Sequence, residues 1–112
     1  FTAAEEELSR LGLAALEGER PLTVVVGGLG LAYTAVTALD DSRVASLTVI
    51  DALPAVIDWH ERRLLPTSGR LLDDGRTALV EADFFAVMRT EPGTHPALAE
   101  PVDAILLDVD HT

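Results

Sequence analysis

The fold is decided by the stretch Leu22-Thr23-Val24-Val25-Val26-Gly27-Gly28-Leu29-Gly30. Its β-branched run predicts a buried strand over residues 22–26, because Val and Thr side chains fit a pleated, packed surface. The glycines predict a tight turn. Residues 31–39, which follow, carry apolar side chains at 31, 35 and 38–39, the spacing of a short helix. Strand, glycine turn and helix in this order are typical of the first unit of an α/β protein.

The same alternation of helices and strands continues to both ends of the chain. A helix that opens on the capping-box pattern Thr2-Ala3-Ala4-Glu5 and ends at Gly18 precedes the first strand. The remaining patterns predict, in order, a strand over 46–50, a helix from Pro54 to Pro66, a loop over 66–76, a strand over 77–81, a helix over 84–88, a loop over 89–101 and a strand over 104–107. Strands joined by helices form parallel sheets through right-handed crossovers. We therefore predict an α/β fold, a Rossmann-like doubly wound parallel sheet with strand order 3-2-1-4.

The last predicted strand, residues 104–107, is continuously apolar, like the strand over 22–26. Such runs are typical of strands with helices on both faces. In the order 3-2-1-4 this strand stands at the sheet edge, where an apolar strand invites aggregation. We therefore expect a sheet that is incomplete at its C-terminal end. Residues 1–112 would be the N-terminal, cofactor-binding portion of a larger domain, with a leading helix over 1–20 and a Rossmann-like core over 22–110.

The composition excludes several classes of protein. A net charge of −11 argues against a duplex nucleic-acid binder and against a polybasic membrane-surface module. The absence of cysteine excludes disulfide scaffolds, thiolate zinc sites and cysteine nucleophiles. The sequence has no apolar stretch long enough to span a bilayer and no secretory signal. We expect a cytoplasmic protein that acts on a small molecule and has neither a nucleic-acid nor a membrane partner.

Each predicted strand ends in a residue suited to ligand binding, at the edge where doubly wound sheets hold their ligands. The turn Gly28-Leu29-Gly30 lets the backbone approach a ligand closely, or serves packing alone. Asp51 can accept both hydroxyls of a ribose or cap the following helix, and Asp83 can accept an adenine amino group or cap the helix after it. Asp108 can act as a general base or remain a solvated loop acid. Four such residues on consecutive strand ends favour a site over coincidence.

Other motifs of catalysis and metal binding are missing. His60 is interpreted as a packed histidine rather than a ligand, because it lies on the predicted buried stripe of its helix with Leu53, Val56, Ile57 and Leu64. His95 lies in a proline-rich loop and His111 near the end of the sequence, so we expect no metal site. The glycine turn lacks the Lys-Ser/Thr end of a P-loop, and no G-x-S-x-G nucleophile elbow is present. Nucleoside triphosphate hydrolysis is disfavoured.

Five segments in this order and spacing resemble the spermidine synthase group of the class I S-adenosylmethionine-dependent methyltransferase superfamily. They are Val24-Val25-Val26-Gly27-Gly28-Leu29-Gly30, Val49-Ile50-Asp51-Ala52-Leu53-Pro54-Ala55-Val56-Ile57, Leu72-Asp73-Asp74-Gly75-Arg76, Ala82-Asp83-Phe84-Phe85 and Asp103-Ala104-Ile105-Leu106-Leu107-Asp108. The resemblance covers residues 22–110. It implies the methyltransferase type of the doubly wound sheet.

The resemblance implies a role for each candidate residue. Gly28 and Gly30, with Leu29 between them, match the family's glycine loop beside the nucleoside and amino-acid part of the cofactor. Asp51, followed by Ala52, matches the acidic residue that holds the ribose hydroxyls. Asp83, followed by Phe84, matches the aspartate that contacts adenine. Asp108 matches the aspartate that deprotonates the attacking amine of putrescine. The implied reaction transfers an aminopropyl group from decarboxylated S-adenosylmethionine and releases methylthioadenosine, without a metal.

Departures from the family's pattern keep two alternatives open. Leu31 stands where the family has an aspartate that meets the donor's amine, and Glu7-Leu8-Ser9-Arg10-Leu11 lacks the family's polyamine-binding Tyr-His-Glu. Asp108-Val109-Asp110-His111-Thr112 replaces its Asp-Ser-Ser/Thr-Asp-Pro run. The alternatives are a methyltransferase that binds intact S-adenosylmethionine, and a non-catalytic domain for nucleoside binding or assembly. Because spermidine synthases are commonly dimers or larger, the resemblance also makes a homodimer a candidate.

Overall fold

The strand order predicted from the sequence is confirmed by the computed structural model, which describes residues 2–29, 32–89 and 101–107, and of residues 2–6 and 8 the backbone only. One sheet contains four parallel strands in the order β3-β2-β1-β4. The elements are α1 (Thr2–Ala14), β1 (Leu22–Gly27), α2 (Tyr33–Leu39), β2 (Val44–Asp51), α3 (Pro54–Glu61), α4 (Ser68–Leu72), β3 (Thr77–Glu81), α5 (Phe84–Met88) and β4 (Ala104–Leu107).

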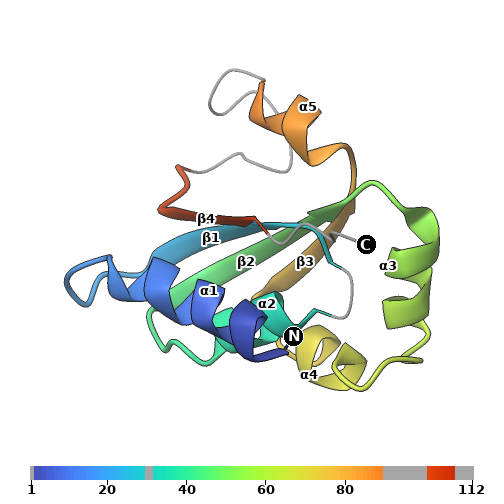
Figure 1. Ribbon diagram of the computed structural model, residues 1–112, viewed down its shortest axis with the longest axis horizontal. Coiled ribbons are helices and arrows are strands. Elements are labelled where there is room, and N and C mark those ends of the chain that lie inside the picture. The colour runs from blue at the N-terminus through green and yellow to red at the C-terminus, as the bar shows by residue number, and fades with distance from the viewer. Residues whose placement is uncertain (1, 30–31, 90–100, 108–112) are drawn as a thin grey trace.

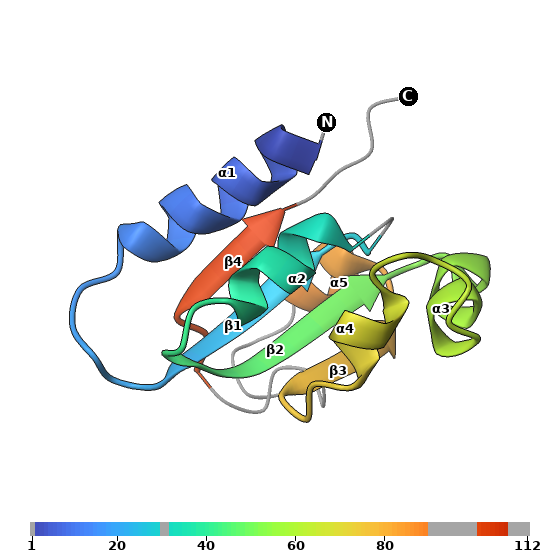
Figure 2. The ribbon, with the colours of Figure 1, turned by 90° about the horizontal axis from the view of Figure 1, so that it is seen from below.

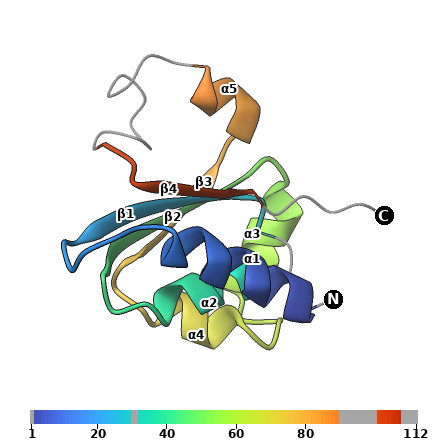
Figure 3. The same cartoon turned by 60° about the vertical axis from the view of Figure 1, so that its left-hand side comes forward.

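Helices lie on both faces of the sheet, as a doubly wound fold requires. Helices α1, α2 and α4 cover one face, and α5 stands alone on the other (Figure 3). Figure 2 shows α1, α2 and α4 in front of the strands, with α3 beyond the ends of β2 and β3. The change of face follows from the chain path, because right-handed crossovers that move from β1 to β3 and then back to β4 place their helices on opposite sides.

The core is divided by the sheet into two clusters. Val24 and Val26 of β1 face the larger cluster under α1, α2 and α4, whereas Val25 faces a smaller one with Ile50 and Val87. All three valines of β1 are at most 1% exposed. The expectation of helices on both faces of the first strand is therefore confirmed. Burial on both faces is why the β1 sequence is continuously apolar rather than alternating.

Strand β4 differs from this expectation, because only one of its faces is covered. Leu106 is 3% exposed and packs in the larger cluster, but Ile105 and Leu107 are 51% and 40% exposed. Within the described ranges β4 pairs with β1 alone, so it is an edge strand. Helix α5 has only five residues, and its Val87 packs with Val25 and Ile50, whereas Ile105 stays exposed.

The segment 66–76 was expected to be a loop, and this was wrong. Residues Ser68–Leu72 form α4, a five-residue helix whose Leu71 is fully buried in the larger cluster. No side chain caps its N-terminus, so burial of Leu71 rather than a local sequence signal stabilises the helix. The glycine, proline and paired aspartates around this helix are typical of loops, so the sequence does not indicate that Leu71 is buried.

The predicted buried stripe of α3 is only half correct. Ile57 and His60 are buried, but Leu53 and Leu64 are 59% and 58% exposed. The helix ends at Glu61, and Arg63 takes a positive φ of 57°, so the chain turns away before Leu64 can continue the stripe. Leu53 precedes the first helical turn as its N-cap residue. Smaller differences are that α1 ends at Ala14 rather than Gly18, and that β2 begins two residues early.

No helix among the described residues is both long and apolar enough to cross a membrane.

Candidate functional site

The glycine turn after β1 lies at the carboxyl edge of the sheet, beside the end of β2. The backbone N–H of Gly28 donates to the carbonyl oxygen of Ile50 at 2.8 Å, which extends the β1–β2 ladder past the last residue of the strand. Gly28 has φ of +100°, in the left-handed region that favours glycine. The positive φ of Gly28 therefore lets the chain turn out of the sheet, and the backbone of this turn lies at the carboxyl edge.

Asp51, the last residue of β2, connects this turn to the start of α3. Its Oδ2 accepts from the backbone N–H of Leu29 at 2.8 Å, and its Oδ1 accepts from that of Leu53 at 2.8 Å. The capping alternative is not realised, because the N-cap position of α3 is Leu53. A carboxylate has about four acceptor sites, so each oxygen keeps a lone pair for a further donor such as a hydroxyl.

Asp83 follows β3 and caps α5, which confirms the capping alternative for this residue. Its Oδ1 accepts from the backbone N–H groups of Phe85 at 2.9 Å and of Ala86 at 3.3 Å. Its Oδ2 accepts no hydrogen bond from the described residues. The cap thus uses one carboxylate oxygen and leaves the other available at the carboxyl edge. Capping and ligand binding are compatible here.

Phe84, the first residue of α5, packs against the end of β1. A Cβ built on Gly27 would lie 2.7–2.9 Å from three atoms of the Phe84 ring, which is closer than real Cβ contacts. The ring of Phe85 meets that of Phe84 edge to face, at a centroid distance of 5.4 Å. Two aromatic rings therefore lie where the β3–α5 turn approaches the glycine turn.

The remaining candidate residues are distributed as follows. Leu29 is 1% exposed, so its side chain belongs to the core and only its backbone faces the turn, whereas Ala52 is exposed. Gly30, Leu31, His95, Asp108 and His111 lie outside the described residues. The structure therefore bonds the backbone of Leu29 to Asp51 and that of Gly28 to Ile50, the residue before Asp51, with Asp83 after the neighbouring strand.

His60 is packed inside the protein, as its position on the helix predicted. It is fully buried, and its Nδ1 lies 3.0 Å from the hydroxyl oxygen of Ser68, which is also fully buried. This contact joins α3 to α4. In the part of the chain that the structure describes, no three His, Asp or Glu residues gather as metal ligands would.

The opposite, amino edge of the sheet holds a feature that the sequence analysis missed. The pattern Asp-x-Arg occurs directly before two strands, as Asp41-Ser42-Arg43 and Asp74-Gly75-Arg76. In each copy the guanidinium Nε and Nη2 donate to the two carboxylate oxygens, at 3.1 and 2.7 Å for Arg43 and at 2.9 and 2.7 Å for Arg76. Repetition of this pattern before β2 and β3 is the signal that could have revealed it.

Both arginines also bind backbone carbonyls at helix ends. Arg43 donates to the carbonyl oxygens of Leu13 and Leu16 at 2.9 and 2.7 Å, near the end of α1. Arg76 donates to those of Leu39 and Val44 at 2.7 and 2.9 Å, at the end of α2 and the start of β2. A cation at a helix C-terminus satisfies carbonyls that have no partner within the helix. These two clamps join helices to strands.

The electrostatics of the amino edge follow from these bonds. Hydrogen bonds from Arg76 hold the pKa of the Asp74 carboxyl far below its usual range, and Arg43 lowers the pKa of Asp41 in the same way. At the start of β4, the Thr23 N–H and, next, Arg20 lower the pKa of Asp103. By contrast, no arginine pairs with Asp51 or Asp83 among the described residues.

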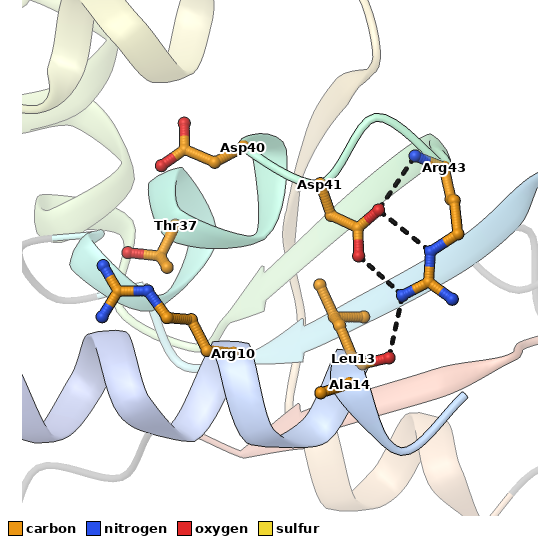
Figure 4. A pocket seen from close by; sticks show the side chains of 7 residues that line it. All are labelled: Arg10, Leu13, Ala14, Thr37, Asp40, Asp41 and Arg43. Carbon is orange, nitrogen blue, oxygen red and sulfur yellow. Dashed lines mark hydrogen bonds and ion pairs between the residues drawn. The ribbon is translucent and has the colours of Figure 1, made fainter. Parts of the chain in front are cut away.

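A cavity of about 410 Å³ between α1 and α2 also lies at this amino edge (Figure 4). Its charged groups are engaged already, since Asp41 pairs with Arg43 and Asp40 pairs with Arg70. The full lining is Arg10, Leu13, Ala14, Thr37, Asp40, Asp41 and Arg43. The cavity belongs to the helix–strand clamps and is remote from the glycine turn, which lies at the other end of the strands (Figure 1).

Comparison with known proteins shows which fold this is. A spermidine synthase from Thermotoga maritima superposes with a TM-score of 0.78 over 99% of this chain, at 21% sequence identity. The fold is that of spermidine synthases. A second spermidine synthase, solved in complex with the transition state analogue AdoDATO, matches with a TM-score of 0.61 over 72% of this chain, also at 21% identity. The alignments span 35% and 27% of the two enzymes' chains, and no protein-family model or curated protein matches the sequence.

Proposed function

We propose that this chain forms the nucleoside-binding part of an aminopropyltransferase-like enzyme. Its donor would be decarboxylated S-adenosylmethionine and its acceptor a polyamine, with the reaction in the cytoplasm. The turn at Gly28, Leu29 and Gly30 would face the donor. Asp51, beside Ala52, would accept its ribose hydroxyls, and Asp83, beside Phe84, would accept the adenine amino group.

The proposed reaction needs a base and no metal. The lone pair of a neutral acceptor amine attacks the aminopropyl carbon bonded to the sulfonium. The carbon–sulfur bond breaks, and its electron pair neutralises the sulfur in methylthioadenosine. Before the attack, the carboxylate of Asp108 takes a proton from the cationic primary amine of the acceptor, which frees this lone pair, and the product is a secondary ammonium. A carboxylate at this place also attracts the cationic amine before the reaction.

One observation supports the proposal most strongly. The carboxyl edge holds Asp51 and Asp83 on adjacent strand ends, both fixed by backbone N–H groups and neither paired with an arginine in the described ranges. All eight Lys and Arg positions are arginines, and six of them pair with aspartates other than Asp51 and Asp83, namely Arg20, Arg43, Arg62, Arg63, Arg70 and Arg76. Unpaired carboxylates favour a cationic ligand. The decarboxylated donor carries a sulfonium and an ammonium and no carboxylate.

Calorimetric titration with three ligands tests the proposal. We expect decarboxylated S-adenosylmethionine and methylthioadenosine to bind, and intact S-adenosylmethionine to bind more weakly. Turnover with putrescine should be lost in Asp108→Asn, with donor affinity retained. Tighter binding of intact S-adenosylmethionine would indicate a methyltransferase. Absence of binding by all three would favour a domain that keeps only the fold.

We also propose that residues 1–112 are the N-terminal portion of a larger domain, with the leading helix over 1–20 and the core over 22–110. The proposal is supported by the pairing of β4 with β1 alone among the described residues and by the exposed side chains of Ile105 and Leu107. Reading the coding sequence tests it. Further strand and helix patterns after residue 112 are expected, and a stop codon there would contradict the proposal.

A further inference from the structure

Gly27 has no room for a side chain, although its backbone conformation would allow one. It ends β1 and is buried, and its φ is not in the left-handed region, so its backbone would accept another residue. A Cβ at this position would lie 2.7 Å from Cδ1, 2.8 Å from Cε1 and 2.9 Å from Cγ of Phe84. The ring therefore packs directly on the backbone of β1, and any side chain on Gly27 would displace it.

This contact joins two turns that are far apart in the sequence. Gly27 immediately precedes the glycine turn, and Phe84 immediately follows Asp83, whose carboxylate caps α5. The half-buried ring also packs with the cluster of Val25, Ile50 and Val87 on the α5 face of the sheet. The depth at which the ring packs on Gly27 thus sets how close the β3–α5 turn lies to the glycine turn.

We infer that Phe84 is a positioning residue, which through its ring on Gly27 holds Asp83 and the glycine turn at the separation that a nucleoside needs. The inference rests on the proposed function, because the ligand is the nucleoside that both turns would bind. Phe84 need not touch the ligand for this role. It acts by filling the space between two backbone segments that each contribute a binding group.

The first test removes the ring and compares affinity for methylthioadenosine by calorimetry. Phe84→Ala is expected to raise the Kd about tenfold, because Asp83 can then move relative to the glycine turn. Val87→Ala is the matched control, since Val87 lies on the same short helix, is 2% exposed and packs in the same cluster, whereas the atoms nearest to a Cβ on Gly27 all belong to Phe84. It should lower the unfolding temperature and leave the Kd within about twofold of the wild type.

The second test uses the fit between the two residues. Gly27→Ala should weaken binding at least as much as Phe84→Ala, because the new methyl group pushes the ring away. The double variant Gly27→Ala/Phe84→Ala should bind more tightly than Gly27→Ala alone, since removal of the ring makes room for the Cβ. All titrations are made at a temperature at which circular dichroism shows each variant folded.

The outcomes separate this inference from the function on which it rests. If wild-type protein does not bind methylthioadenosine, the proposed function fails and the inference falls with it. If wild-type protein binds, but Phe84→Ala and Val87→Ala weaken binding equally, Phe84 has only a packing role and the inference is overturned. A double variant that binds no better than Gly27→Ala would also overturn it.

Discussion

The two edges of the sheet use aspartate in opposite ways. At the amino edge, Asp41, Asp74 and Asp103 each pair with an arginine at 2.6–2.7 Å and lie beside the start of a strand. At the carboxyl edge, Asp51 and Asp83 accept only backbone N–H groups from the residues described. The aspartates of this acidic chain therefore have two kinds of partner. Those paired with arginines fasten helices to strands, and those at the carboxyl edge keep acceptor sites, which we propose for the ligand.

The contrast extends to the arginines themselves. A guanidinium that clamps a helix end has its donors committed to carbonyls and to one carboxylate, so it neutralises charge locally. Removal of a clamp should therefore affect folding and leave ligand binding unchanged. Removal of a carboxylate at the other edge should do the reverse.

The largest effect on stability is expected from Arg76→Met. The change removes hydrogen bonds to Leu39, Val44 and Asp74 and should lower the free energy of unfolding by roughly 2–3 kcal/mol, measured in urea. Affinity for methylthioadenosine should stay within about twofold below the unfolding transition. Arg62→Met, whose side chain is 66% exposed on the surface, is the control and should cost less than about 0.5 kcal/mol. If Arg76→Met loses as much binding free energy as folding free energy, the amino edge does not serve folding alone.

Asp51→Asn should have the opposite profile. The amide keeps one acceptor oxygen but loses the charge and points N–H groups at a neighbouring donor, so affinity for methylthioadenosine should fall about 10- to 100-fold. The free energy of unfolding should fall by about 1 kcal/mol, since one backbone N–H of Leu29 or Leu53 loses its acceptor. Asp58→Asn, on the exposed side of α3, serves as the control for charge alone. Equal affinities of Asp51→Asn and wild type would contradict a role for Asp51 in the site.

The pH dependence of stability should report the amino edge. Asp41, Asp74 and Asp103 have lowered pKa values in the folded chain, so below about pH 4, the usual range of aspartate, the unfolded chain binds more protons. The stabilisation is complete above that pH and is lost as the pH falls through the folded values. The midpoint temperature of thermal unfolding should therefore be nearly constant from about pH 7 to 5 and should fall below about pH 4. In Asp74→Asn the unfolding temperature should fall less steeply with decreasing pH. A slope equal to that of the wild type would show that Asp74 does not contribute to this pH dependence.

The smallest effect separates the two tasks of Asp83. Asp83→Asn retains an N-cap and should cost only a few tenths of a kcal/mol, whereas Asp83→Ala should cost about 1 kcal/mol in urea unfolding. Both variants lose the free carboxylate oxygen, so both should bind methylthioadenosine more weakly to a similar extent. If only Asp83→Ala loses affinity, the cap rather than the carboxylate serves the ligand.

The fold could be predicted because its signals are local. The β-branched run of β1, the glycines after it and the alternation of strands with helices define the sheet and its order without any long-range information. Helix α4 could not be predicted, because a helix of five residues that begins Ser68-Gly69 depends on burial of Leu71 in the larger core cluster. The exposure of Leu53 and Leu64 could not be predicted either, because the helical spacing of apolar residues does not indicate where the helix begins or that the chain turns at Arg63.

The candidate site shows the same division between local and distant signals. Strand ends could be located, so Asp51 and Asp83 were identified together with both of their alternatives. The choice between capping and binding could not be made, because it depends on which backbone N–H groups come within reach. For Asp51 these are Leu29 and Leu53, one of them 22 residues away. The ring of Phe84 packs on Gly27 across a still longer separation in the chain, and the sequence around neither residue predicts this contact.

The most direct test of the division between the edges is a titration of ¹⁵N-labelled protein with methylthioadenosine, followed by amide chemical shifts. We expect the amide signals of Gly28, Leu29, Leu53 and Phe85 to shift and to saturate with one dissociation constant. The amides of Arg43 and Arg76 at the amino edge should stay in place. Shifts centred on Arg43 and the cavity between α1 and α2, with a quiet glycine turn, would contradict it.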